Sequence, residues 1–532
     1  MSCFRRRHPP PRLLAVCAAC LLSIGLAPPA PSSAQSELDR LDEMRAKRHA
    51  KRVCSEFFLA GREPAEVLEQ DHDSNDTTVS IRIRRRQRTV EATTIIGSVG
   101  EAIYRPGLGC TLLHGVDPDA LTEQGVGAPV ASQLDAAQPW PRGAAPATSR
   151  GAEVDAAALD QALLDAFVET SSRRERGTRA VAVVWDGQLV AERYAPGFRS
   201  DQPMLTWSIN KSILNALLGV LAQQGRLDVE APVGTPEWAA GDPRARITID
   251  EMLHMTAGLE FEEVYETALV DVVEMLFTSR DMAAFAAAKQ LEHPPGTRWK
   301  YSSGTTNILA RMMRRAIGGP LSDYTYFPRR ELFEKLGMSH TTLELDTVGT
   351  FAASSFGYST ARDLARLGQL FLQDGVWEGE RLLPEGWVAY TTAPTPLAPQ
   401  RSYGAHFWLN AGNPDNPRDR LWPSVPTDAF GMSGFEGQSV VIVPSRKAVV
   451  VRLGRTLRPE AWDLDRFLAS VLAALPQPPA PPPRPPIEPA DGASAPTDPA
   501  SDPEPPPETE GAEQPPDAPS LASGAAAGGG EE

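Results

Sequence analysis

Apolar residues recur three and four positions apart over residues 208–224, near the middle of the chain, which predicts a helix with a buried face. The positions that carry this pattern are Ile213, Leu214, Leu217, Leu218 and Leu221. Further helices are expected over Val154 to Thr170 and Ala461 to Leu475, and helical stretches fill much of residues 248–375.

Short runs of β-branched residues predict strands at both ends of this region. The run Val181–Trp185 is followed by Asp186-Gly187, which favours a two-residue hairpin turn, and then by the run Gln188–Tyr194. Near the end of the region, Ser439–Val443 and Ala448–Leu453 form a second pair joined by a short turn. Hairpins at both ends with helices between them predict an α/β (α+β) fold, with one antiparallel sheet covered by helices.

The first residues have the composition of a targeting segment. Arginines precede the apolar run Leu13–Ala27, and small residues at 32–34 follow it. This order predicts a signal peptide over residues 1–34 and therefore an exported protein, periplasmic or secreted. An uncleaved membrane anchor and lipid attachment at Cys17 or Cys20 are the alternatives.

Two further segments precede the region of helices and strands. Residues 35–115 form an N-terminal extension, and residues 116–151, rich in Ala, Pro and Gly, form a linker. The extension holds Cys54 and Cys110, and an even pair in an exported chain suggests one disulfide, with two free thiols as the alternative. The basic run 82–88 is expected on an exposed hairpin whose charges are offset by preceding aspartates. Nucleic-acid binding is disfavoured because the protein is acidic and exported.

Most of the acidic charge lies at the C-terminal end. Residues 477–532 hold eleven acidic residues and one arginine, a net of −10 out of −16, together with 17 of the 50 prolines. Such a segment cannot bury a core and is expected to be a disordered, solvated spacer. Attachment to surface components is the alternative. The globular domain is thereby confined to residues 152–476.

One Ser-x-x-Lys motif lies in the first turn of the predicted 208–224 helix. Ser208 and Lys211 would share a helix face, which brings the amine within hydrogen-bond reach of the hydroxyl. A serine is a poor nucleophile until a base takes its proton, and the positive end of a helix favours the negative charge that develops. Of the seven lysines, only Lys211 follows a serine at this spacing. Taken alone, the motif also fits an N-cap serine with a surface lysine.

Two other hydrolytic mechanisms lack their motifs in this sequence. The histidines are scattered, and neither H-x-H nor H-E-x-x-H occurs, so no metal or other cofactor is expected. The G-x-S-x-G motif of α/β-hydrolases is also absent; the segment Gly431–Phe435 comes closest and lacks the final glycine.

Three motifs occur along the chain in the order Ser208-x-x-Lys211, Tyr301-Ser302-Ser303-Gly304 and Gly434-Phe435-Glu436-Gly437-Gln438. With these motifs in this order, the chain resembles the serine β-lactamase/penicillin-binding-protein superfamily, and within it the 6-aminohexanoate-dimer hydrolase and esterase-like branch. Residues 248–259, 293–297 and 360–363 give supporting matches, and the extension with its cysteines resembles that of such hydrolases.

The resemblance implies a β-lactamase-like domain with a helical subdomain over residues 152–476, and acyl transfer through a covalent serine intermediate. Ser208 would attack the carbonyl carbon, either Lys211 or Tyr301 would accept its proton, and Tyr301 would protonate the leaving group. Ser303 would orient Lys211 or the substrate. The backbone N–H groups of Ser208 and Gln438 would form the oxyanion site.

The third motif departs from the family pattern at Phe435. The family usually has Lys or His at this position, whose cation holds a substrate carboxylate. Phe435, Gly437 and Gln438 are expected to bind the substrate, and an apolar wall there favours small esters or uncharged amides over penicillins. A β-lactamase or D-Ala-D-Ala carboxypeptidase remains an alternative, as does a non-catalytic or impaired binding protein on the same fold.

Overall fold

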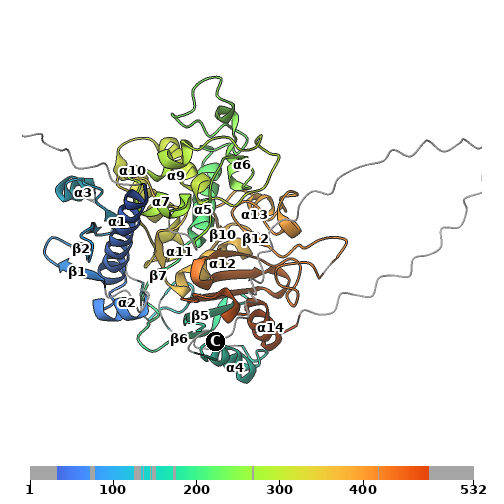
Figure 1. The fold of residues 1–532 in the computed structure, drawn as a ribbon. Coiled ribbons are helices and arrows are strands. Elements are labelled where there is room, and N and C mark those ends of the chain that lie inside the picture. The colour runs from blue at the N-terminus through green and yellow to red at the C-terminus, as the bar shows by residue number, and fades with distance from the viewer. Residues whose placement is uncertain are drawn as a thin grey trace, which may run out of the picture.

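The computed structural model combines a main β-sheet, a helical region and the N-terminal extension, which lies along one side (Figure 1). It describes residues 33–71, 78–124, 134–135, 137–143, 145, 151–171, 175–265, 269–416 and 418–477. The predicted signal peptide up to residue 32, much of the predicted linker and the tail from residue 478 lie outside the described residues.

The main sheet contains both predicted hairpins. Within the described residues it has six antiparallel strands. The first and last hairpins lie side by side because β15 pairs with β5, so segments far apart in sequence form the middle of the sheet. The spatial order is β12 (Trp408–Leu409), β13 (Phe430–Gly434), β14 (Gln438–Val443), β15 (Ala448–Gly454), β5 (Thr178–Trp185) and β6 (Gln188–Tyr194).

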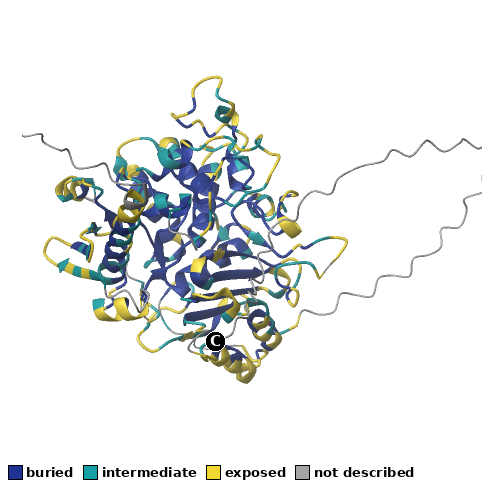
Figure 2. Cartoon of the chain, viewed as in Figure 1, coloured by how far each residue is buried: buried dark blue, intermediate teal, exposed yellow. Residues whose placement is uncertain are grey.

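Helices bury both faces of this sheet (Figure 2). Alternate residues of β5 show this: Val181 and Val183 belong to the core beneath α4 (Ala156–Ala166) and α14 (Leu464–Ala474), whereas Ala182 and Val184 face the core shared with α12 (Ala361–Leu372). Because strand side chains alternate between faces, strands buried on both sides read as continuous apolar runs.

The two terminal helices are shorter than predicted. Asp155 caps α4 by accepting the N–H of Ala158, and Asp463 caps α14 by accepting the N–H of Arg466. Each aspartate satisfies a first-turn donor and so fixes where the helix begins. The residues before Asp463 form a short 3₁₀ turn, Pro459–Ala461, instead of helix.

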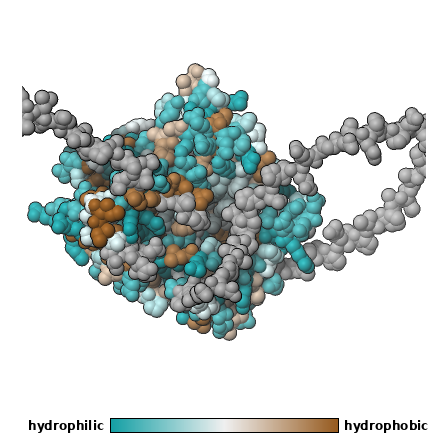
Figure 3. Space-filling model, viewed as in Figure 1, coloured by the Kyte–Doolittle hydropathy of each residue, from teal (hydrophilic) through white to brown (hydrophobic). Residues whose placement is uncertain are grey.

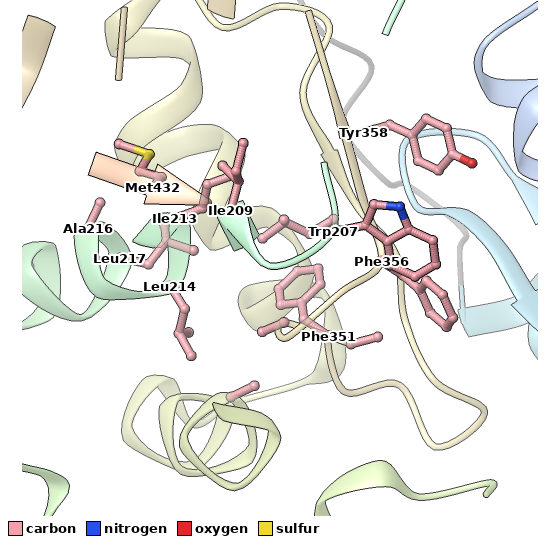
Figure 4. Close-up of a cluster of buried hydrophobic side chains, with 14 of the residues drawn as sticks. Trp207, Ile209, Ile213, Leu214, Ala216, Leu217, Phe351, Phe356, Tyr358 and Met432 are labelled. Atoms are coloured by element: carbon pink, nitrogen blue, oxygen red, sulfur yellow. The ribbon is translucent and has the colours of Figure 1, made fainter. Parts of the chain in front are cut away.

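Helix α5 (Ile209–Gln223) confirms the prediction for residues 208–224 and lies in the centre of the domain. Every residue from Ile209 to Leu221 is buried, so the helix is covered on all sides. Figure 4 shows Ile213, Leu214 and Leu217 directed into this core. Its neighbour α9 (Ser303–Ile317) carries the second motif at its start.

Short elements complete the domain. The other helices in the described ranges are α6 (Ile249–Leu253), α7 (Asp271–Phe277), α8 (Met282–Ala287), α10 (Leu321–Pro328), α11 (Glu334–Leu336) and α13 (Trp387–Thr391). Two small sheets are formed by β7 (Met204–Leu205), β9 (Gly357–Ser359) and β8 (Thr342–Leu343), and by β10 (Val376–Trp377) and β11 (Glu380–Arg381). Within the described residues, none of the helices is both long and apolar enough to cross a membrane.

The extension is a helix packed on a small antiparallel sheet. A Cβ at Gly100 would lie 2.4 Å from the backbone of Ala46, so only glycine permits this close contact between helix and sheet. The predicted disulfide is present and joins Cys54, at the end of the helix, to Cys110. The elements are α1 (Ser33–Cys54), α2 (Pro64–Gln70), β1 (Val79–Arg84), β2 (Thr89–Thr94), β3 (Val99–Arg105), β4 (Gly109–Leu112) and α3 (Pro118–Gln124).

The basic run 82–88 lies on an exposed hairpin, as predicted, but Asp71 is not a charge partner of its arginines. Arg82 is 70% exposed, and Arg84 binds Glu91 at 2.6 Å on the neighbouring strand. Asp71 does not offset these arginines: it is buried and pairs with Arg62 and Arg179. The other two aspartates, at 73 and 76, lie outside the described residues. On the face shown in Figure 3, hydrophobic residues gather over the N-terminal extension.

Two parts of the predicted linker are ordered. Helix α3 falls within residues 116–151 and packs on the extension through Leu121, whereas Trp140 is buried against the domain. Its indole N–H donates to the carbonyl of Gly187 at 3.1 Å, and the guanidinium of Arg366 lies 4.6 Å from its ring centroid. The indole of Trp140 therefore anchors this part of the linker to the domain, although the Ala, Pro and Gly content of the linker alone would leave it unstructured.

Candidate active site

Ser208 and Lys211 meet at the start of α5. The Lys211 Nζ donates a hydrogen bond of 2.8 Å to the Ser208 Oγ. Ser208 occupies the N-cap position, yet its side chain makes no capping hydrogen bond. Lys211 is only 1% exposed. The alternative of a capping serine followed by a surface lysine is therefore wrong.

Lys211 is a buried amine with a small set of oxygen partners. Besides Ser208, its Nζ donates to the Ser303 Oγ at 3.0 Å and to the Ser354 carbonyl at 3.3 Å. Burial lowers the pKa of Lys211 to about 8, and the carboxylate of Glu263 opposes this change. Because a lysine pKa near neutrality leaves part of the amine unprotonated, this group can accept a proton.

The second motif supplies Ser303, which connects Lys211 to a carboxylate. The Ser303 hydroxyl donates to Glu263 at 2.5 Å, and its backbone N–H donates to the same carboxylate at 2.7 Å. The Tyr265 hydroxyl donates to Glu263 at 3.0 Å. Glu263 was not among the predicted site residues, because one glutamate in an acidic loop carries no motif. Glu263 becomes a candidate site residue only in the structure, where it binds Ser303 at the start of α9.

Tyr301 covers the other side of the amine. Its ring centroid lies 4.7 Å from the Lys211 Nζ and stacks on Trp408, with centroids 5.6 Å apart. Burial raises the pKa of Tyr301 strongly, the nearby charge of Glu263 adds to this, and a hydrogen bond with Ser208 partly opposes it. The phenol therefore stays protonated at physiological pH and can donate a proton.

The third motif lies against the segment that precedes Ser208. A Cβ at Gly434 would lie 2.4 Å from the Thr206 carbonyl oxygen, so glycine permits this approach. Gly437 has a φ of +82°, a conformation that favours glycine. The Gln438 side chain is held within the sheet. Its amide group binds both the N–H (2.9 Å) and the carbonyl (2.6 Å) of Gly454, which braces β14 against β15.

Phe435 is part of an aromatic wall. It is 38% exposed, stacks on Tyr265 with centroids 4.8 Å apart and meets Trp207 edge-on at 5.5 Å. An exposed ring held by two other rings presents an apolar surface and no charge. The structure thus brings together residues of all three motifs, with the Gln438 side chain bound to Gly454. In the described part of the chain, no group of three or more His, Cys, Asp and Glu residues could hold a metal ion.

Comparison with known proteins identifies the family of this chain. The sequence model of the family described as Beta-lactamase matches residues 161–474, more than half of the chain. The chain belongs to the Beta-lactamase family. This membership confirms the predicted fold and superfamily, and it makes the protein a hydrolase by family.

Individual proteins are similar to parts of this chain. The 6-aminohexanoate-dimer hydrolase of Paenarthrobacter ureafaciens is 28% identical over 297 residues, which cover 52% of this chain and 73% of that protein. A penicillin-binding protein homolog from Caulobacter crescentus is 20% identical with a TM-score of 0.46, over 60% of this chain and 97% of that one. A family VIII carboxylesterase is 17% identical with a TM-score of 0.47, over 60% and 96%.

Proposed function

We propose that this Beta-lactamase-family protein is an exported serine hydrolase that forms an acyl-enzyme on Ser208 and hydrolyses small neutral esters or amides. One observation carries the proposal: the 2.8 Å hydrogen bond between the Lys211 Nζ and the Ser208 Oγ, made by an amine whose pKa burial lowers to about 8. With that pKa, about a tenth of the amine is neutral at pH 7, against roughly one part in three thousand for an ordinary lysine.

Acylation begins when the neutral Lys211 amine takes the hydroxyl proton and the Ser208 Oγ attacks the substrate carbonyl carbon. The carbonyl electron pair moves to oxygen, and the resulting oxyanion accepts hydrogen bonds from the backbone N–H groups of Ser208 and Gln438. As the intermediate collapses, the bond to the leaving alcohol or amine breaks. Tyr301 protonates the leaving atom, and the proton held by Lys211 restores the phenol.

Deacylation repeats the same steps with water as the nucleophile. Lys211 takes a proton from the water while the water oxygen attacks the acyl carbon, and the bond between the acyl carbon and the Ser208 Oγ breaks. The serine oxygen regains a proton, and the carboxylic acid leaves. No group beyond those at the site is needed to balance either half of the reaction.

Lys211 is a better base than Tyr301 in this arrangement. Burial lowers the pKa of the amine, which favours its neutral, basic form. The same burial raises the pKa of the phenol, which disfavours the phenolate that a tyrosine base requires. The low dielectric environment therefore supports different roles for the two residues, Lys211 as base and Tyr301 as acid. Ser303 then serves to orient the amine through its 3.0 Å contact.

The aromatic wall and the relatives support the substrate class. Phe435, held between Tyr265 and Trp207, presents an apolar surface where a cation would bind a carboxylate. The Paenarthrobacter relative is named a hydrolase of the 6-aminohexanoate dimer, which supports a small-molecule substrate. The disulfide Cys54–Cys110 and the targeting pattern of the first residues support export.

Labelling with a fluorophosphonate probe tests the nucleophile. The wild type should be labelled and Ser208→Ala should not, while Ser445→Ala, a change at an exposed serine, should be labelled like the wild type. Lys211→Ala should lower the acylation rate by roughly 10²–10⁴, the usual scale for a positioned acid–base group. Equal labelling of wild type and Ser208→Ala would remove Ser208 from the mechanism. A folded wild type without labelling or ester turnover would favour a binding protein instead.

A further inference from the structure

A buried carboxylate next to the active site has no part in the proton transfers described above. Glu436 lies inside the third motif with a φ of +62°, and its side chain is 7% exposed. Its Oε2 accepts the indole N–H of Trp207 at 3.1 Å. A buried charge of this kind is costly unless it is paired and hydrogen-bonded, so its partners are informative.

The first partner, Trp207, immediately precedes the nucleophile. Its φ is +49°, which is unusual for a bulky residue and persists only where neighbouring groups hold it. Trp207 is 8% exposed, and Figure 4 shows its side chain directed away from the α5 core, toward Phe356 and Tyr358 and the extension. The hydrogen bond to Glu436 is one of the interactions that hold this conformation.

The other partners are two arginines. Arg455, beyond the end of β15, lies 3.5 Å from Glu436, and Arg52, in the last turn of α1, lies 3.8 Å from it. Burial alone would lower the pKa of Arg52, but Glu436 and Glu56 outweigh it and raise this pKa. The Arg52 guanidinium also lies 5.9 Å from the ring centroid of Trp207. Arg52 therefore contacts both members of the hydrogen-bonded pair.

The position of Arg52 is fixed by the extension. Cys54, two residues further along, is bonded to Cys110, which ties the end of α1 to β4. Arg52 also pairs with Glu56 at 3.3 Å and with Asp71 at 3.5 Å, so its charge is shared among three carboxylates. The extension thus reaches the residue before the nucleophile through groups that are 12% exposed or less.

We infer that Arg52 and Glu436 are positioning residues, through which the N-terminal extension sets the geometry of the oxyanion site. The two donors proposed for that site come from separate segments: Ser208 follows Trp207, and Gln438 lies two residues after Glu436. The Trp207–Glu436 hydrogen bond joins these segments, and Arg52 holds the pair. This inference rests on the proposed function. Since oxyanion donors act mainly on the transition state, a disturbed geometry should lower kcat and leave KM nearly unchanged.

Kinetics normalised to active sites test this inference in the full-length protein. We expect Arg52→Met and Glu436→Gln each to lower kcat for p-nitrophenyl acetate by about tenfold per fluorophosphonate-labelled site, with KM changed by less than about twofold. Arg52→Lys should recover part of the loss. The double variant should lose about as much as either single variant, because the two residues act as one unit. Arg82→Met, which changes an exposed arginine of the extension, is the matched control and should match the wild type.

The possible results separate this inference from the proposed function. If the wild type is labelled and the variants keep its kcat per labelled site, the inference is wrong and the proposed function stands. A loss confined to the number of labelled sites, with an unchanged rate per site, would show a role in folding only and would also overturn the inference. A wild type that is not labelled overturns the proposed function, and the inference with it. If Arg52→Met does not fold, Glu436→Gln and Arg52→Lys give the same comparison.

Discussion

Glu263 is expected to set the pH at which this hydrolase becomes active. The rate of acylation should rise with pH as Lys211 loses its proton, with a midpoint near its pKa of about 8. The carboxylate of Glu263 raises that pKa against the effect of burial. The substitution Glu263→Gln removes the charge and keeps an oxygen that can accept the Ser303 hydroxyl. The midpoint should therefore move to lower pH.

The structure gives the size of this change. Hydrogen bonds of 3.0 Å and 2.5 Å connect Lys211 to Ser303 and Ser303 to Glu263, which places the two charges at most about 5.5 Å apart. At an effective dielectric constant of about 20, Coulomb's law gives roughly 3 kcal/mol for this pair, or about two pH units. Glu263 is half-buried, so solvent screening reduces the effect. We expect a decrease of between about one and two pH units.

The assay is the single-turnover acylation rate with p-nitrophenyl acetate between about pH 5.5 and 9.5. A midpoint moved down to about 7 would raise the neutral fraction of Lys211 at pH 6 about tenfold over the wild type. Removing a carboxylate should thus accelerate the reaction in mild acid. Glu262→Gln, a change at the exposed neighbouring glutamate, is the matched control and should keep the wild-type midpoint.

Three outcomes would contradict this reasoning. An unchanged midpoint in Glu263→Gln would show that the charge does not act on the base. A loss of more than about 10² at every pH would identify Glu263 itself as the base. A wild-type rate that is flat from about pH 6 to 9 would exclude Lys211 as the group whose deprotonation limits acylation.

Two further predictions concern specificity and stability. Phe435→His should raise activity on carboxylate-bearing substrates by about tenfold relative to neutral esters, because a cation can bind the carboxylate; efficient nitrocefin turnover by the wild type, above its ester turnover, would contradict this. Cys54→Ser/Cys110→Ser should lower the free energy of unfolding by about 4 kcal/mol in urea titrations, because the bond closes a long loop. Reductant should destabilise the wild type and not the double variant, and two free thiols in the exported protein would refute the prediction.

The sequence predicted the parts of the fold that local patterns specify. The two hairpins follow from β-branched runs and the Asp186-Gly187 turn, and α5 follows from apolar spacing. The strands β7, β8 and β12 have two residues each, so no periodicity could indicate them. They are held by neighbours distant in sequence; β7, for example, pairs with β9 through Met204 and Ser359.

The same distinction holds for the site. The Ser-x-x-Lys spacing and the order of the three motifs made Ser208, Lys211 and Tyr301 candidates, and the structure places these three residues together. Glu263 could not be found this way: it meets Ser303 through tertiary packing across 40 positions of sequence. The contacts of the Gln438 side chain were also out of reach, since they depend on Gly454 of the neighbouring strand.

The surroundings of Phe435 explain why arginines near the third motif do not restore the missing cation. Arg52 and Arg455 both lie close to this motif, but both face Glu436, and their side chains are only 12% and 13% exposed. Their positive charge is therefore offset by a buried carboxylate next to Phe435. A substrate carboxylate placed there would meet an apolar ring backed by arginines that already pair with buried carboxylates, and it would lose its hydration without a partner. A neutral ester or amide carries no such cost, so the pairing of Arg52 and Arg455 with Glu436 agrees with the substrate class that we propose.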